Sequence, residues 1–158
     1  MSSILRLKSG QSPRTRVTIS KKETGEVLFQ DSNIIVQQGI YAYLLGLTQA
    51  YTTSPLTTLQ LGLGGTADPQ GLIPLVPART QTQLNSYLTS LPLLVSAPTL
   101  SSTEVTFLAT LPTGSANGSL ISEAGMFTTS GVMQNYITFP GITKISEFSL
   151  NISWSVSV

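Results

Sequence analysis

Residues 148–158 read Phe-Ser-Leu-Asn-Ile-Ser-Trp-Ser-Val-Ser-Val, so apolar and small polar side chains alternate without interruption. Successive side chains of a β-strand point to opposite faces of its sheet, and the alternation therefore predicts a half-buried strand. Trp154 belongs to the apolar set, which favours a place in the core over a place on a binding surface. The polar set holds only serine and asparagine. We expect this polar face, or a free edge of the strand, to be partly covered by a neighbouring subunit.

The composition indicates one domain with an unusually uncharged surface. A chain of 158 residues can bury one sizeable core and is short for two, so we expect a single domain over residues 1–158. Only 9% of the residues are charged, against about a quarter in typical domains. Such a surface is typical of a subunit that is largely covered in an assembly. An extracellular β domain would explain the composition equally well.

The residue types that are missing exclude most catalytic chemistry. The chain has no Cys and no His, which removes disulfides, thiolate chemistry and the commonest metal ligand and general base. Gly62-Leu63-Gly64-Gly65 follows an apparent strand, but no Gly-Lys-Ser/Thr and no following helix accompany it, so we reject a phosphate loop. We expect no enzyme activity, no catalytic, cofactor-binding or metal-binding residues, and no cofactor.

The carboxylates are scattered, and one of them stands in an apolar stretch. A paired acid and base for glycoside hydrolysis is not visible in the sequence. Glu123 lies within residues 120–127, whose other members look buried. A buried carboxylate is costly unless it accepts backbone N–H bonds or pairs with Arg or Lys, so we expect Glu123 to fix a turn or bulge. The seven carboxylates are Glu23, Glu26, Asp31, Asp68, Glu104, Glu123 and Glu147.

Six of the eight basic residues stand near the start of the chain. Exposed positions on a first hairpin are the simplest interpretation, and contact with an acidic capsid or neighbouring subunit is the alternative. No aromatic residues interleave these charges, so no nucleic-acid partner is expected. No apolar run reaches the length of a membrane span and no signal peptide is visible, so we expect no membrane partner and synthesis in the cytoplasm. The six residues are Arg6, Lys8, Arg14, Arg16, Lys21 and Lys22.

The first half of the chain mixes strand and helix patterns. Residues 16–20 and 26–29 flank a turn sequence and predict a β-hairpin. Apolar residues then recur at spacings of three and four, which predicts a helix over Val36–Thr48. Alternating leucines at 59–63 predict a further strand that runs into the glycine turn.

Residues 66–100 predict an extended excursion with short edge strands, because five prolines interrupt any continuous element. The excursion is rich in Pro, Thr, Gln and Leu. Its apolar residues must cover the domain's own core or a neighbour's surface. They include Leu72, Ile73, Leu75, Val76, Leu91, Leu93 and Leu94.

The second half predicts antiparallel strands. Alternation resumes near Thr103, and Leu120–Thr128 forms a strand that returns through a tight turn as Val132–Phe139. Pro140-Gly141 is expected to break the chain before the terminal strand. The expected fold is mainly β: an antiparallel β-sandwich or jelly-roll-like domain with one short α-helix.

Several of these segments together resemble a family of tailed-bacteriophage virion structural proteins, the small β-sandwich decoration or tail-collar-like proteins. The resemblance rests on residues 23–29 with 33–39, on 59–67, and on a C-terminal third made of 121–127, 137–144 and the alternating strand. It implies a β-sandwich that packs on other virion proteins and brings no catalytic residues. The chain departs from the pattern in residues 66–100, where a subunit-specific contact is expected.

We therefore expect a non-enzymatic structural subunit of a bacteriophage virion, made in the host bacterial cytoplasm. A capsid decoration or cement protein that stabilises the head is preferred, because the chain lacks the repeats and heptads of a complete fibre. Expected partners are the major capsid protein, or tail or neck proteins, and further copies in a homo-oligomer. The alternatives are a tail, collar, baseplate or fibre-adaptor component, a host-carbohydrate-binding module and, last, a glycan hydrolase. Carbohydrate binding would use exposed aromatics among Tyr41, Tyr43, Tyr51, Tyr87 and Tyr136.

Overall fold

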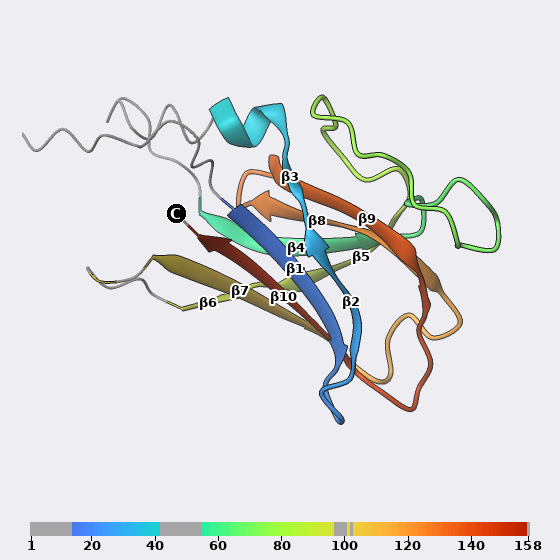
Figure 1. Cartoon of the computed structure of the whole chain (residues 1–158). Coiled ribbons are helices and arrows are strands. Elements are labelled where there is room, and N and C mark those ends of the chain that lie inside the picture. Colours follow the sequence, from blue (N-terminus) through green and yellow to red (C-terminus); the bar gives the residue numbers. More distant parts are fainter. Residues whose placement is uncertain (1–13, 42–54, 97–100, 102, 158) are drawn as a thin grey trace, which may run out of the picture.

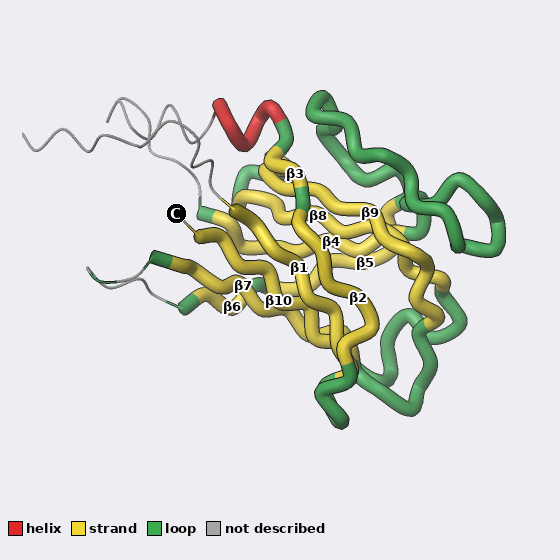
Figure 2. The backbone as a smooth tube through the Cα atoms, viewed as in Figure 1, coloured by secondary structure: helices red, strands yellow, loops and turns green. Residues whose placement is uncertain are grey.

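The chain folds into two five-stranded antiparallel sheets packed face to face, which confirms the predicted antiparallel β-sandwich (Figures 1 and 2). The computed structural model describes residues 14–41, 55–96, 101 and 103–157. The first sheet has the order β2 (Val27–Ser32), β1 (Arg14–Lys21), β10 (Leu150–Ser157), β7 (Glu104–Leu111), β6 (Leu94–Val95). The second has the order β3 (Ile34–Ile35), β9 (Met133–Thr143), β8 (Leu120–Thr128), β4 (Leu56–Gly62), β5 (Tyr87–Pro92).

The alternating C-terminal strand is the middle strand of the first sheet. β10 pairs along its whole length with β1 on one side and β7 on the other, so the predicted free edge is wrong. Leu150, Ile152 and Trp154 point into the core, while the serines and Asn151 lie on the outer face. A central strand gains both ladders of hydrogen bonds and the burial of one complete face. The alternation in the sequence follows from that position.

The middle strand of the second sheet is buried on both faces. Every residue of β8 after Leu120 is buried, and the strand has the predicted bounds. Ala124 and Met126 pack in the main core between the sheets. Glu123 and Phe127 point the other way, toward the outer face of the second sheet. Something must therefore cover that outer face.

The covering comes from the segment between β4 and β5 and from a short helical turn. Leu84 packs in a second apolar cluster with Val36, Phe127, Met133 and Tyr136. Residues 37–41 are helical, and Ile40 N donates to Val36 O at 3.1 Å. The predicted helix Val36–Thr48 thus starts where expected, and its remainder lies outside the described residues.

Each lateral edge of the sandwich is formed by a segment that passes from one sheet to the other. β2 leads into β3 through Asn33, and β5 leads into β6 through Leu93. The Asn33 carbonyl oxygen accepts a hydrogen bond from Thr15 Oγ1 (3.0 Å), and its side-chain oxygen accepts one from Trp154 Nε1 (3.1 Å). The first corner therefore satisfies the polar atom of the buried indole. Of the four edge strands, β3 and β6 have only two residues each and present little edge for unwanted pairing, whereas β2 and β5 have six residues each.

β9 continues through Pro140-Gly141, so the predicted break at this dipeptide is wrong. Ile142 pairs with Ile121 and Thr138 pairs with Glu123, which leaves three residues of β9 opposite one residue of β8. The irregularity is a β-bulge, a position that tolerates proline because the ladder hydrogen bonds are interrupted there. Gly141 N donates instead to Gly71 O of the excursion at 2.7 Å.

Truncation of the buried indole tests the packing of the two sheets. Trp154→Ala should lower the free energy of unfolding by about 3–5 kcal/mol, because it leaves a large cavity and removes the partner of Asn33. Urea unfolding followed by circular dichroism measures the change. Ser146→Ala, on an exposed turn, is the matched control and should stay within about 0.5 kcal/mol of the parent. Equal transition midpoints for the two variants would contradict this packing.

Candidate functional site

The best-developed polar cluster of the described chain surrounds Glu123. This residue has no exposed surface, although it carries a carboxylate. It lies on the outer face of the second sheet, beneath residues 63–65 and 84–86, which approach it from both sides. Burial of a carboxylate without compensation would strongly disfavour folding. Its partners therefore define what this cluster does.

Four donors converge on the two oxygens of Glu123. Oε1 accepts hydrogen bonds from Gly64 N (3.0 Å) and Ser86 N (2.8 Å). Oε2 accepts hydrogen bonds from Asn85 N (3.0 Å) and the Tyr136 hydroxyl (2.6 Å). Three backbone amides and one phenol thus replace the water that a free carboxylate would bind. The prediction that Glu123 accepts backbone N–H bonds and fixes a turn is confirmed.

Tyr136, which lies on β9, closes this cluster. Asn85 Nδ2 donates to the Tyr136 oxygen (3.3 Å) and to Gly64 O (3.0 Å). The pKa of the Tyr136 phenol is strongly raised by burial and further raised by its hydrogen bond to the Glu123 carboxylate and by that group's charge. The phenol therefore stays protonated and acts as a donor. It is also too buried to contact a carbohydrate.

The glycine turn after β4 packs directly on β8. Gly64 N is bound to Glu123, and Gly65 N donates to Ser122 Oγ at 2.9 Å. A Cβ at Gly65 would overlap the carbonyl oxygen of Ser122, so only glycine fits at this approach. The amides that a phosphate would need are engaged within the protein. Their geometry agrees with the rejection of a phosphate loop at Gly62-Leu63-Gly64-Gly65.

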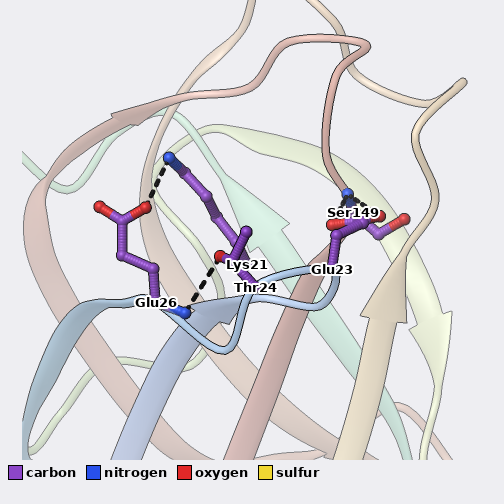
Figure 3. Close-up of polar contacts among 5 residues, drawn as sticks. All are labelled: Lys21, Glu23, Thr24, Glu26 and Ser149. Atoms are coloured by element: carbon purple, nitrogen blue, oxygen red, sulfur yellow. Dashed lines mark hydrogen bonds and ion pairs between the residues drawn. The ribbon is translucent and has the colours of Figure 1, made fainter.

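A second carboxylate ties the first hairpin to the terminal strand (Figure 3). Both oxygens of Glu23 accept the hydrogen bond of Ser149 N, at 2.9 and 3.0 Å. Beside it, Lys21 forms an ion pair with Glu26 (2.7 Å), and Thr24 Oγ1 accepts a hydrogen bond from Glu26 N (3.2 Å). The Ser149 amide is the main reason why the pKa of Glu23 lies below its ordinary value of 4.5.

Lys144 is fully buried, although no local sequence pattern around it indicates burial. Its Nζ donates to Thr113 O (3.1 Å), Asn117 Oδ1 (3.0 Å) and Ile145 O (2.8 Å). Burial lowers the pKa of Lys144, and the negative charge of Glu23 partly opposes that shift. The three acceptors use all three donors of the ammonium, so this lysine holds the loop before β8 against the segment before β10.

Four of the exposed large apolar residues of the described chain stand close together in one loop. We use the term 72–76 loop for residues 72–76, of which Leu72, Ile73 and Val76 are 72%, 60% and 92% exposed. The Asp68 carboxylate accepts hydrogen bonds from the backbone N–H groups of Leu72 (3.0 Å) and Ile73 (2.7 Å). Thr138 Oγ1 donates a hydrogen bond to the carbonyl oxygen of Leu75. The loop is thus fixed at its base and presents apolar side chains outward.

The remaining candidate residues do not converge. Tyr41 is exposed on the helical turn and Tyr87 is exposed at the start of β5, whereas Tyr43 and Tyr51 lie outside the described residues. Arg14 and Arg16 lie on the outer face of β1, and Arg6 and Lys8 lie outside the described residues.

The described residues contain no group of three or more acidic side chains placed to hold a metal ion. Among the same residues, none of the helices is long and apolar enough to cross a membrane. No protein-family model, curated protein or solved structure matches the chain. The contacts define an antiparallel β-sandwich in which the buried carboxylate and the buried lysine both have partners within the chain.

Replacement of the buried carboxylate by its amide tests the cluster. Glu123→Gln should lower the free energy of unfolding by about 2–3 kcal/mol, because the new NH₂ group faces backbone donors in place of an acceptor. Tyr136→Phe removes one donor only and should cost about 1–2 kcal/mol. Urea unfolding gives the values, and amide hydrogen exchange at Asn85 and Ser86 should accelerate in Glu123→Gln. Unchanged exchange at both amides would contradict the described role.

Acid titration tests the contact between Glu23 and Ser149. The pKa of Glu23 is lowered in the folded protein, so its stabilising contribution is present above the ordinary pKa and is lost as the pH falls through the folded pKa. The free energy of unfolding should therefore decrease below about pH 5. Glu23→Gln should make this decrease smaller. Identical slopes for the variant and the parent between about pH 5 and pH 2 would contradict the assignment.

Proposed function

We propose that the protein is a non-enzymatic structural subunit of a bacteriophage virion that acts as a capsid decoration or cement protein on the head. The observation that carries the proposal is the 72–76 loop, where a protein with 9% charged residues displays adjacent apolar side chains on a fixed backbone. Contiguous exposed apolar residues mark protein contact surfaces. A rigid loop loses little conformational entropy when it docks.

The buried ionisable groups support a structural role. The polar atoms of Glu123 and of Lys144 form hydrogen bonds with the protein's own backbone and side chains. Asp68 and Glu23 likewise accept backbone N–H groups at turns. Carboxylates used in this way stabilise loops that a shell subunit must hold in one conformation. The resemblance of the C-terminal third to phage virion proteins gives this role its setting.

The 72–76 loop would also suit a subunit of the tail, collar or baseplate. Analysis of separated heads and tails distinguishes a head location from a tail location. Mass spectrometry of purified heads and tails should find the protein in heads. Recovery in tails only would overturn the decoration role and leave a tail component. Polysaccharide turnover by the purified protein would overturn the structural assignment altogether.

Substitution in the 72–76 loop tests whether this loop contacts the particle. Val76→Asp should reduce the protein's occupancy on heads by at least about tenfold, because burial of an unpaired carboxylate in an apolar contact is costly. Ser146→Asp adds the same charge on another exposed turn and should keep parental occupancy. Quantitative mass spectrometry of heads assembled with each variant gives the ratio. Parental occupancy for Val76→Asp would place the contact elsewhere.

A further inference from the structure

The outer face of the first sheet carries short polar side chains at most of its positions. We call it the hydroxyl face and define it by the outward side chains of β1, β10 and β7. Of its twelve positions, three carry charge and the others carry mainly hydroxyl or amide groups. They are Arg14, Arg16, Thr18, Ser20, Glu104, Thr106, Leu108, Thr110, Asn151, Ser153, Ser155 and Ser157.

Cross-strand hydrogen bonds order the short side chains of this face. Thr110 Oγ1 donates to Asn151 Oδ1 at 2.8 Å, and the hydroxyls of Thr106 and Ser155 lie 3.3 Å apart. The four polar side chains of β10 are half-buried within the sheet itself, because their neighbours on β1 and β7 flank them. Because these side chains are short and ordered, the outer face of a second sheet can approach the hydroxyl face closely.

The charges of the hydroxyl face stand in a fixed register. Arg14 pairs with Ser157, and Ser157 pairs in turn with Glu104, so the opposite charges occupy the two ends of one row across the sheet. Two strand spacings, about 10 Å, separate the Cα atoms of Arg14 and Glu104, and the described structure places no ion pair between their side chains. Both side chains are exposed.

We propose that the hydroxyl face docks a second copy of this chain around a two-fold axis that runs along β10. Rotation about this axis lays β1 of one copy over β7 of the other without changing the position along the strands. Arg14 then faces the partner's Glu104, and the contact occurs twice because the interface is isologous. Thr18 and Leu108 both pair with Ser153, from opposite sides, so the same rotation places Thr18 over the partner's Leu108.

The strand register also shows which residues would meet if the two-fold axis took the other orientation in the plane of the interface. A two-fold axis perpendicular to the strands would lay β1 on the partner's β1 in reverse direction. Arg14 would then face the far end of the same strand, near Ser20, and Glu104 would face Thr110. No opposite charges would meet. Charge complementarity therefore selects the axis along β10.

The area is sufficient for a stable pair. The five strands of the first sheet contain 32 residues, which at about 4.8 Å by 3.3 Å each cover roughly 500 Å² per copy. The two copies together would bury about 1,000 Å², which is the lower limit for a specific interface. The serines at the centre impose no steric barrier to face-to-face packing of the sheets.

Sedimentation velocity of the full chain over about 1–100 µM tests the proposal, and it does not depend on the virion role. The parent should form dimers. Ser153→Arg, at the centre of the face, should raise the dissociation constant by at least about tenfold, because it places like charges against each other across the axis. Ser146→Arg is the matched control and should leave dimerisation unchanged.

A charge exchange tests the axis. Arg14→Glu and Glu104→Arg should each weaken the dimer by at least about tenfold, because each creates two contacts between like charges. The double variant restores opposite charges and should return to within about threefold of the parent. A monomeric parent, a dimer that tolerates Ser153→Arg, or a double variant as weak as the single ones would each overturn the proposal. None of these outcomes bears on the presence of the protein in heads.

Discussion

The carboxylate of Glu123 holds together the part of the molecule that strand pairing alone would leave loose. It stands in the middle strand of the second sheet, on a face that would otherwise be open to solvent. By accepting three backbone N–H groups from the two ends of the segment between β4 and β5, it fixes both the glycine turn after β4 and the approach to β5. A buried carboxylate is stable only with such donors, and the segment between β4 and β5 supplies them where it covers the outer face of the second sheet.

The two sheets therefore differ in what they present. The second sheet is covered on its outer face by its own chain, through the Glu123 cluster and the apolar cluster around Leu84. The first sheet keeps an outer face of serine, threonine and asparagine with few charges. The excursion that covers one sheet also projects the 72–76 loop. Surfaces for contact with other proteins thus lie on two different parts of the domain.

Carboxylates at turns recur as a means of stabilisation in this chain. Asp68 and Glu123 each accept hydrogen bonds from at least two backbone amides, and Glu23 accepts the Ser149 amide with both of its oxygens. Each joins segments that a strand ladder does not connect, or closes a loop upon itself. In a protein with few charges, these acidic groups serve the backbone more than the surface. Several of the few charged residues of this chain therefore serve to hold loops in place.

Strand periodicity and apolar patterning are local properties, and they were enough to predict the class of fold, the bounds of β8, the first hairpin and the buried state of Trp154. The apolar neighbours of Glu123 also indicated that its carboxylate needs either backbone N–H donors or a basic partner, and the structure supplies backbone donors. The central place of the terminal strand, the bulge by which β9 passes through Pro140 and the burial of Lys144 became visible only in the folded chain. These outcomes depend on pairings and acceptors far apart in the chain, which no local pattern encodes.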